Sequence, residues 1–367
     1  MKILFDPQVF MLGYSGMKSY YSTLFKGLPD AGIDIVYPNR SIVENIAGQN
    51  SLLDNILHPK LQFVRNRYRL HRLKKDYYRA LENLNYDLVY ITSPTFESEF
   101  LDHIQKKPYV MTVHDTMQIA RGNHTFVDQP RDTKALGFLA DHAEIVVCNS
   151  NYTQNDLCNL YLTDREKTHT VYLANFLDTD PVPVEHLPER YILFLGSRLG
   201  RKNFWAWIRA ISPFLHENPD LKVIVTGQIS PYEKYFYEKI RVLKQITVLE
   251  NVTNAQLVTL YKNALCLSYP TLYEGFGLPV IEAMANGCPV ITANNSSIPE
   301  VGGDAVLYVD PLDHESMLGG LKKITNNPAF RDELVQKGLE RSKIFSTEKC
   351  ISGMIDLFEK AVGSYQK

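Results

Sequence analysis

The sequence lacks the features that mark secreted, membrane-spanning and nucleic-acid-binding proteins. Its five cysteines are scattered, odd in number and free of any C-x-x-C pair, which argues against a disulfide framework or a structural zinc. No apolar run approaches the roughly 20 residues of a spanning helix, and the chain opens on a strand-like segment without a signal peptide's features. A net charge of −2 gives no global attraction for nucleic acid. We therefore expect a cytoplasmic protein of ordinary globular composition.

What the sequence does contain is a repeated alternation of short apolar, β-branched runs with helical patterns. Its 367 residues suit two domains. Buried runs separated by helices predict parallel strands, and the series restarts after a proline-rich stretch, 180–188. We therefore expect an α/β fold of two doubly wound, Rossmann-like domains, 1–180 and 181–345. The expected strands are 2–5, 34–37, 88–92, 110–113 and 145–148, then 191–195, 222–226, 246–249, 264–268, 289–292 and 305–309.

The most informative segment, 269–290, sets two carboxylates, Glu274 and Glu282, eight positions apart. Between them lie a glycine-rich turn and Pro279, and proline is favoured in the first turn of a helix. The backbone amides of 275–278 would then point outward at the positive end of a helix, an arrangement that binds phosphate. Because carboxylates accept hydrogen bonds from vicinal hydroxyls, the segment favours a ligand with both phosphate and hydroxyls, such as a sugar nucleotide.

Other interpretations of the two carboxylates stay open at this point. A pair of acids also serves glycoside hydrolysis, although a hydrolase needs no diphosphate cradle. In a purely structural interpretation, Glu282 pairs on the surface and Glu274 caps the following helix.

Further motifs follow other predicted strands, where ligands bind in doubly wound sheets. Arg201 and Lys202 lie in a glycine-containing strand-to-helix loop and suit a diphosphate, or they form a solvated basic turn. His114, in the opposite half, could hydrogen-bond a donor sugar from across the cleft, or be structural; no second ligand stands at a spacing usable for a metal. The loop of Gly13 and Gly16 could bring amides to phosphate, or be a plain turn.

One segment, 60–79, is strongly basic, with eight Lys or Arg against one acid. Its apolar residues recur at helical spacing. The pattern predicts a basic amphipathic helix that lies on an anionic membrane or holds an anionic acceptor, with a solvated surface helix as the alternative.

With these motifs in view, the chain resembles, nearly end to end, the retaining glycosyltransferases of family 4, whose fold is called GT-B. The resemblance rests on Glu274-Gly-Phe-Gly-Leu-Pro-Val-Ile-Glu282, Gly196-Ser-Arg-Leu-Gly-Arg-Lys-Asn203 and Val113-His-Asp115. It implies that Arg201 and Lys202 hold the diphosphate, that Glu282 holds the ribose, and that His114 contacts the donor sugar. It also implies a closing helix, about 346–367, that packs back on the N-terminal domain, and catalysis without metal or cofactor.

The sequence departs from the family pattern in two places. A denser glycine run is usual where Gly13 and Gly16 stand, and the usual Pro-Asn-Gly reads Leu173-Ala-Asn-Phe176. The family also contacts the base through backbone in a loop that corresponds to 250–253. The site residues implied are Glu274, His114, Lys202 and Arg201 for catalysis, and Glu282, Gly275, Phe276, Gly277, Leu278, Gly16, Gly13, Asn175 and Val252 for substrate binding.

The predicted function is transfer of a hexose, with retention, from a nucleoside-diphosphate sugar to a glycan or lipid-linked glycan in polysaccharide or lipopolysaccharide biosynthesis. Overall resemblance favours GDP-mannose over a UDP-sugar. No nucleic-acid partner is expected, and the protein would be cytoplasmic or peripheral on the inner face of the membrane. The alternatives are a sugar-nucleotide epimerase, a soluble synthase of small glycosides, or a non-catalytic subunit that binds sugar nucleotides. The intact set of site residues argues against the last.

Overall fold

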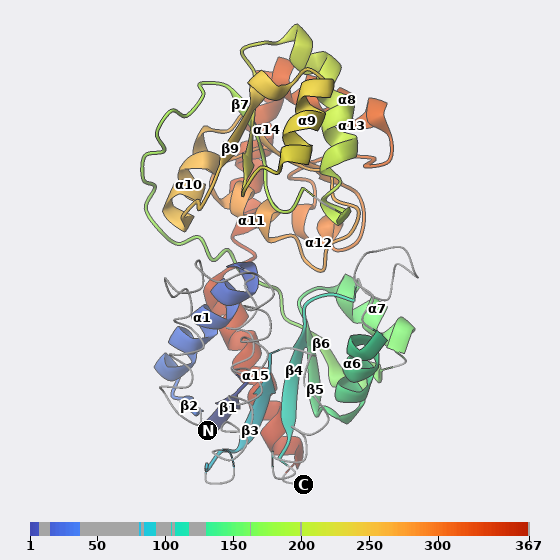
Figure 1. Ribbon diagram of the computed structural model, residues 1–367. Helices are drawn as coiled ribbons and strands as arrows, with labels where there is room; N and C mark the ends of the chain where they lie inside the picture. The colour runs from blue at the N-terminus through green and yellow to red at the C-terminus, as the bar shows by residue number, and fades with distance from the viewer. Residues whose placement is uncertain are drawn as a thin grey trace, which may run out of the picture.

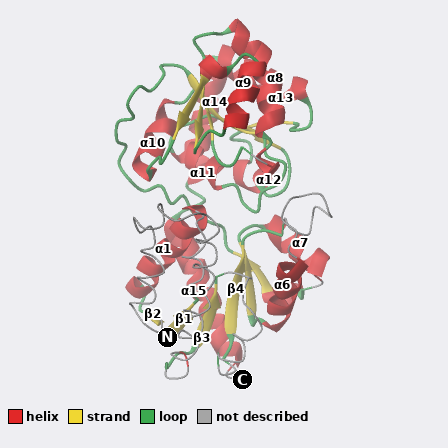
Figure 2. Ribbon diagram, viewed as in Figure 1, coloured by secondary structure: helices red, strands yellow, loops and turns green. Residues whose placement is uncertain are grey.

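A computed structural model of the chain contains two parallel β-sheets, one in each half of the sequence (Figure 1). It describes residues 1–6, 15–36, 81, 84–92, 104, 107–116, 130–161, 163–198 and 200–365. Gly13 and the basic segment 60–79 therefore lie outside the described residues. Helices flank the strands of both sheets (Figure 2), so the predicted class of two Rossmann-like α/β domains is confirmed.

The N-terminal sheet has six described strands in the order β2-β1-β3-β4-β5-β6. Its bounds are β1 Lys2–Phe5, β2 Asp34–Val36, β3 Leu88–Ile91, β4 Tyr109–Val113, β5 Ile145–Cys148 and β6 Thr168–Thr170. The first five agree with the predicted strands to within a residue. β6 was not predicted because Thr-His-Thr is polar and pairs only at the sheet edge.

The C-terminal sheet also has six strands, in the order β12-β11-β10-β7-β8-β9. Its bounds are β7 Tyr191–Phe194, β8 Lys222–Thr226, β9 Ile246–Leu249, β10 Cys266–Tyr269, β11 Val290–Ala293 and β12 Leu307–Val309. The predicted strands lie at these places, shifted by up to two residues. The chain reverses direction through the sheet between β7 and β10, the point at which such sheets bind their ligands.

The described helices pack on these sheets as connections between strands. They are α1 Ser15–Asp30, α6 Pro130–His142, α7 Asn151–Tyr161, α8 Phe204–Glu217, α9 Pro231–Lys239, α10 Asn254–Asn263, α11 Leu278–Ala285, α12 Ile298–Gly302, α13 His314–Asn326, α14 Pro328–Ser342 and α15 Thr347–Tyr365. α13 packs on α8, whereas α14 packs on α11. No helix in the described part of the chain is long and apolar enough to cross a bilayer.

The two domains pack against each other directly, in addition to being connected by the proline-rich stretch 180–188. α15 follows the C-terminal sheet in sequence but packs against α1, β3 and β4 of the N-terminal domain (Figure 1). One continuous core cluster includes Ile3 and Tyr90 from the first domain together with Tyr191 and Val280 from the second. The facing loops of the two sheets are therefore held against each other.

Candidate functional site

The centre of the candidate site is the buried carboxylate of Glu274, which is 5% exposed and meets two cations. Lys202 Nζ lies 2.7 Å from one of its oxygens, and Arg201 forms an ion pair with the other. The Thr271 hydroxyl donates to the same carboxylate at 2.7 Å. Both cations come from a short 3-10 helix, Gly200–Lys202, directly after β7, and Glu274 follows β10. The fold thus brings together residues 72 positions apart at the switch point of the sheet.

Glu274 meets two cations, and the charge of Asp115 also acts on both of them. Burial alone would raise the pKa of Glu274, but the charges of Lys202 and Arg201 outweigh it and hold the pKa below its ordinary value. Burial lowers the pKa of Lys202, and attraction to Glu274 only partly compensates. With Glu274 ionised beside two cations, the cluster can offer positive charge to an anion. That is what stabilises a departing diphosphate.

A set of free backbone amides lies next to this cluster, at the start of α11. The amides of Gly275, Phe276, Gly277 and Leu278 have no acceptor among the described residues. Gly277 adopts a φ of 112°, which favours glycine. The Ser297 hydroxyl lies 2.9 Å from the carbonyl of Glu274 and 2.8 Å from that of Phe276, which holds the turn in place. Open amides at the positive end of a helix can bind a phosphate.

The N-terminus of α1 reaches the same place from the other domain. A Cβ added at Gly16 would lie 3.0 Å from the Cδ1 atom of Leu278. The starts of α1 and α11 therefore adjoin, one from each domain (Figure 1). Two positive helix ends strengthen the attraction for an anion.

Glu282 lies one turn further along α11 and is separate from the ion cluster. Tyr261 donates a hydrogen bond to its carboxylate at 2.8 Å. Burial raises the pKa of Glu282, and neither this bond nor the nearby Lys202 charge fully reverses the effect. Its remaining oxygen can accept a hydrogen bond from a ligand hydroxyl.

His114 directly follows β4, and its backbone lies against Gly275 from the N-terminal domain. Its backbone carbonyl is so near Gly275 that a Cβ added there would lie 1.9 Å from the carbonyl oxygen. The ring is packed edge-on against Tyr20 and Tyr21, with Nε2 2.9 Å from the Tyr21 hydroxyl. Burial lowers the pKa of His114 to about 4, so the ring is neutral at physiological pH.

Hydrogen bonds tie the domains together around these residues. Ser150 donates to the carbonyl of Gly275 at 2.7 Å. The carboxylate of Glu300, in α12, accepts from the amides of Asn151 and Tyr152 at 2.9 and 2.6 Å. Those amides are the first of α7, so an acid of one domain caps a helix of the other.

Two predicted substrate-binding residues lie apart from the ion cluster. Asn175 is placed where the chain crosses between domains: its amide donates to the Phe345 carbonyl at 3.1 Å, and its side chain accepts from Leu177. Val252 packs against the shared hydrophobic core. The structure therefore brings together Glu274, Arg201 and Lys202, with the 275–278 amides adjoining, but not these two.

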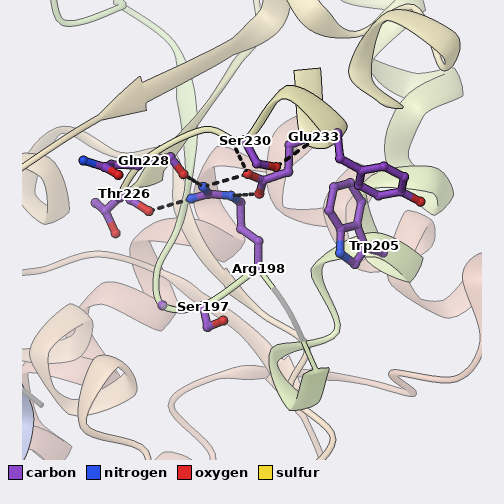
Figure 3. A pocket seen from close by; sticks show the side chains of 10 residues that line it. Ser197, Arg198, Trp205, Thr226, Gln228, Ser230 and Glu233 are labelled. Carbon is purple, nitrogen blue, oxygen red and sulfur yellow. Dashed lines mark hydrogen bonds and ion pairs between the residues drawn. The ribbon is translucent and has the colours of Figure 1, made fainter. Parts of the chain in front are cut away.

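Sequence reasoning missed Arg198, although it stands in the same motif as Arg201. Its side chain is buried, with Nε 2.5 Å from Glu233 and Nη1 donating to the Thr226 carbonyl at 2.7 Å (Figure 3). It lines a cavity of about 440 Å³ between the ends of β7 and β8 and the starts of α8 and α9, which contains none of the predicted site residues. Arg201 likewise donates to a backbone carbonyl, that of Tyr273 at 3.0 Å, so the spacing of the two arginines does not tell which acid each one meets.

Thr271 and Tyr261 were also missed. Both lie near the segment that sequence analysis singled out, but a threonine and a tyrosine in apolar surroundings carry no signal of their own. Only their bonds to Glu274 and Glu282 reveal them as groups that orient the carboxylates.

Two Rossmann-like domains of this kind, facing each other, define the GT-B class of fold. The solved structures that resemble the chain agree. Sucrose-phosphate synthase from Thermosynechococcus elongatus has a TM-score of 0.73 at 16% identity, covering 99% of both chains. HepE of Anabaena, in complex with UDP-glucose, has a TM-score of 0.69 at 17% identity, covering 98% of this chain and 100% of that one.

Sequence comparisons identify the family. The chain matches "Glycosyltransferase Family 4" over 14–181 and "Glycosyl transferases group 1" over 178–341. It is 28% identical over 240 residues to O-antigen chain mannosyltransferase B of Escherichia coli, covering 62% of this chain and 63% of that protein. It is 30% identical over 186 residues to O-antigen chain mannosyltransferase RfbU of Salmonella typhimurium, covering 50% and 51%. The matches thus span less than two thirds of these relatives. The chain belongs to glycosyltransferase family 4.

Proposed function

We propose that the protein transfers a hexose, with retention of configuration, from a nucleoside-diphosphate sugar to a glycan or lipid-linked glycan. The observation that carries the proposal is the pairing of open amides at 275–278 with the cations Arg201 and Lys202, at the switch point of the sheet. Amides without an acceptor beside two cations suit a diphosphate. Glu282 then accepts from a ribose hydroxyl, and Glu274 from the sugar.

The proposed reaction depends on binding of the diphosphate by Arg201, Lys202 and the 275–278 amides. As the bond between the anomeric carbon and the phosphate oxygen breaks, negative charge accumulates on the leaving group beside Arg201 and Lys202. A phosphate oxygen of that group accepts the proton of the incoming acceptor hydroxyl, whose oxygen bonds to the same face of the sugar. The cations and the start of α11 supply the positive charge that a divalent ion supplies elsewhere, so no metal is required.

Mannose from a guanosine diphosphate is the proposed donor, and an oligosaccharide in polysaccharide or lipopolysaccharide synthesis the proposed acceptor. Two O-antigen mannosyltransferases among the sequence relatives support this choice. A UDP-sugar is the second candidate donor, because the structure of HepE contains UDP-glucose.

A thermal-shift screen of GDP, UDP and ADP, followed by turnover of the matching sugars, tests the proposal. A ligand at a hundred times its Kd stabilises the folded state by about 2.7 kcal/mol, so the base that binds is visible before any acceptor is known. We expect GDP to stabilise most, GDP-mannose to be turned over, and EDTA to leave the rate unchanged. Binding without turnover of any sugar nucleotide would instead indicate a non-catalytic subunit.

Lys202→Met provides the specific test of the diphosphate grip, with Lys349→Met as the matched control on the exposed side of α15. Losing a charge-assisted contact of about 1.5–3 kcal/mol predicts a 10- to 100-fold weaker GDP affinity in the first variant and no change in the second. Equal affinities in the two variants would contradict the proposed role of Lys202.

We further propose that the segment 60–79 holds the protein on an anionic membrane surface, where a lipid-linked acceptor would lie. Its eight basic residues support this. Sedimentation with anionic vesicles, compared between the unchanged chain and one with Arg65, Arg67, Arg69 and Arg72 replaced by Glu, measures the effect. Equal sedimentation of the two would exclude the proposal.

A further inference from the structure

The ring of His114 meets the hydroxyl of a buried tyrosine, Tyr21. Tyr21 lies in α1 and is fully buried. Its hydroxyl is 2.8 Å from the carbonyl oxygen of Thr92 and 2.9 Å from Nε2 of His114. The Tyr21 hydroxyl, which also lies near that of Tyr90, has one proton for these contacts, so where that proton goes decides the hydrogen-bonding state of the imidazole.

The carbonyl of Thr92 must receive the proton. Thr92 is 1% exposed, and its carbonyl has no other donor among the described residues. A carbonyl can only accept, and leaving it buried without a partner is unfavourable. The Tyr21 oxygen is then free only to accept from His114, which requires a hydrogen on Nε2.

A neutral imidazole carries one N–H hydrogen, on either Nδ1 or Nε2. The buried ring is neutral at physiological pH, because its pKa is lowered to about 4. With the hydrogen on Nε2, the other nitrogen, Nδ1, keeps its lone pair. Nδ1 has no partner among the described residues, and His114 as a whole residue is partly exposed, although its ring packs against Tyr20 and Tyr21.

We propose that Tyr21 is a positioning residue that holds His114 in the Nε2–H tautomer, so that Nδ1 accepts a hydrogen bond from a hydroxyl of the donor sugar. This rests on the proposed function, in which His114 faces the donor. An acceptor-only nitrogen favours a hydroxyl and repels a carboxylate or carbonyl oxygen at the same place. The site therefore selects donors whose group beside His114 is a hydroxyl, and disfavours those with a carboxylate there.

The tautomer is measured directly by two-bond ¹H–¹⁵N correlation spectra of histidine-labelled protein, with His114→Gln used to assign the signal. We expect the Nε2–H pattern in the unchanged chain at pH 7, and its loss or mixing in Tyr21→Phe. Tyr20→Phe is the matched control, because Tyr20 also packs edge-on against His114 but directs its hydroxyl to Tyr90, 3.1 Å away. An Nδ1–H pattern in the unchanged chain would overturn the proposal.

A double-mutant cycle separates positioning from a merely structural role. Tyr21→Phe should lower kcat/KM on the order of 5- to 10-fold in the unchanged chain, the effect of one hydrogen bond, but less than 2-fold when His114 is already alanine. An equal loss in both backgrounds would show that Tyr21 acts through stability and would refute the positioning role. If no sugar nucleotide binds, the proposed function fails, while the spectra still decide the tautomer.

Discussion

At Gly275 the backbone of one domain lies directly against that of the other, and replacing this glycine by alanine tests the arrangement. The added Cβ would lie 1.9 Å from the carbonyl oxygen of His114 and 2.7 Å from Cβ of Asp115. Because the nearest atom belongs to the backbone, no side-chain rotation relieves the clash. The loops must separate by roughly 1 Å or more to restore ordinary contact.

This separation acts on both function and stability. It stretches the hydrogen bond from Ser150 to the Gly275 carbonyl and moves the 275–278 amides away from His114. Misplacement of reacting groups by 1 Å costs on the order of 10²-fold in rate, whereas overpacking costs about 1–3 kcal/mol of unfolding free energy. We expect kcat for GDP-mannose turnover to fall about 100-fold, in a protein that still unfolds cooperatively in urea.

Gly319→Ala is the control for adding a methyl group to this chain. Gly319 lies within α13 with no heavy atom within 4 Å of the added Cβ, so alanine should stabilise the helix by about 0.5–1 kcal/mol and leave kcat unchanged. An unchanged kcat in Gly275→Ala would refute the reasoning, because the domains would then approach less closely than described.

Three further predictions concern the carboxylates and the histidine. Glu300→Gln removes the charge that caps α7 and should lower the unfolding free energy by about 1 kcal/mol in urea titrations, unlike Glu340→Gln, an exposed acid. For His114, the folded pKa of about 4 lies below the unfolded value of about 6.5, so stability is lost as pH falls from 6.5 to 4. His114→Gln should show a shallower decline over that range, and an identical slope would contradict the burial of a neutral ring. Glu282→Gln should weaken GDP binding about 10-fold but leave inorganic pyrophosphate binding unchanged in calorimetry, because the carboxylate would contact only the ribose.

Strand positions were predictable because buried parallel strands are short apolar runs, and most predicted runs match within one or two residues. β6 was not predicted, because its residues are polar and it pairs at the edge of the sheet, where tertiary pairing overrides composition. The glycine turn and the proline at the start of α11 were predictable for a similar reason, since both encode local backbone geometry.

The partners within the site were not predictable in the same way. Arg198 and Arg201 stand three residues apart in one loop and each donates to a backbone carbonyl, yet the first pairs with Glu233 and the second with Glu274. The spacing of charges in a loop does not specify the direction of each side chain. That direction is set by acids on other elements.

The sequence by itself determined the two α/β series, the strand ends at which ligands bind, and the turn that opens the amides of 275–278. These features depend on backbone preferences and periodicity over a few residues. Only the tertiary structure decided that Tyr21 meets His114, 93 positions away, and that Ser150 meets Gly275, 125 positions away. The first contact forms where α1 packs within the N-terminal domain, and the second where the two domains meet. Both depend on which surfaces pack together, and the local sequence does not specify that.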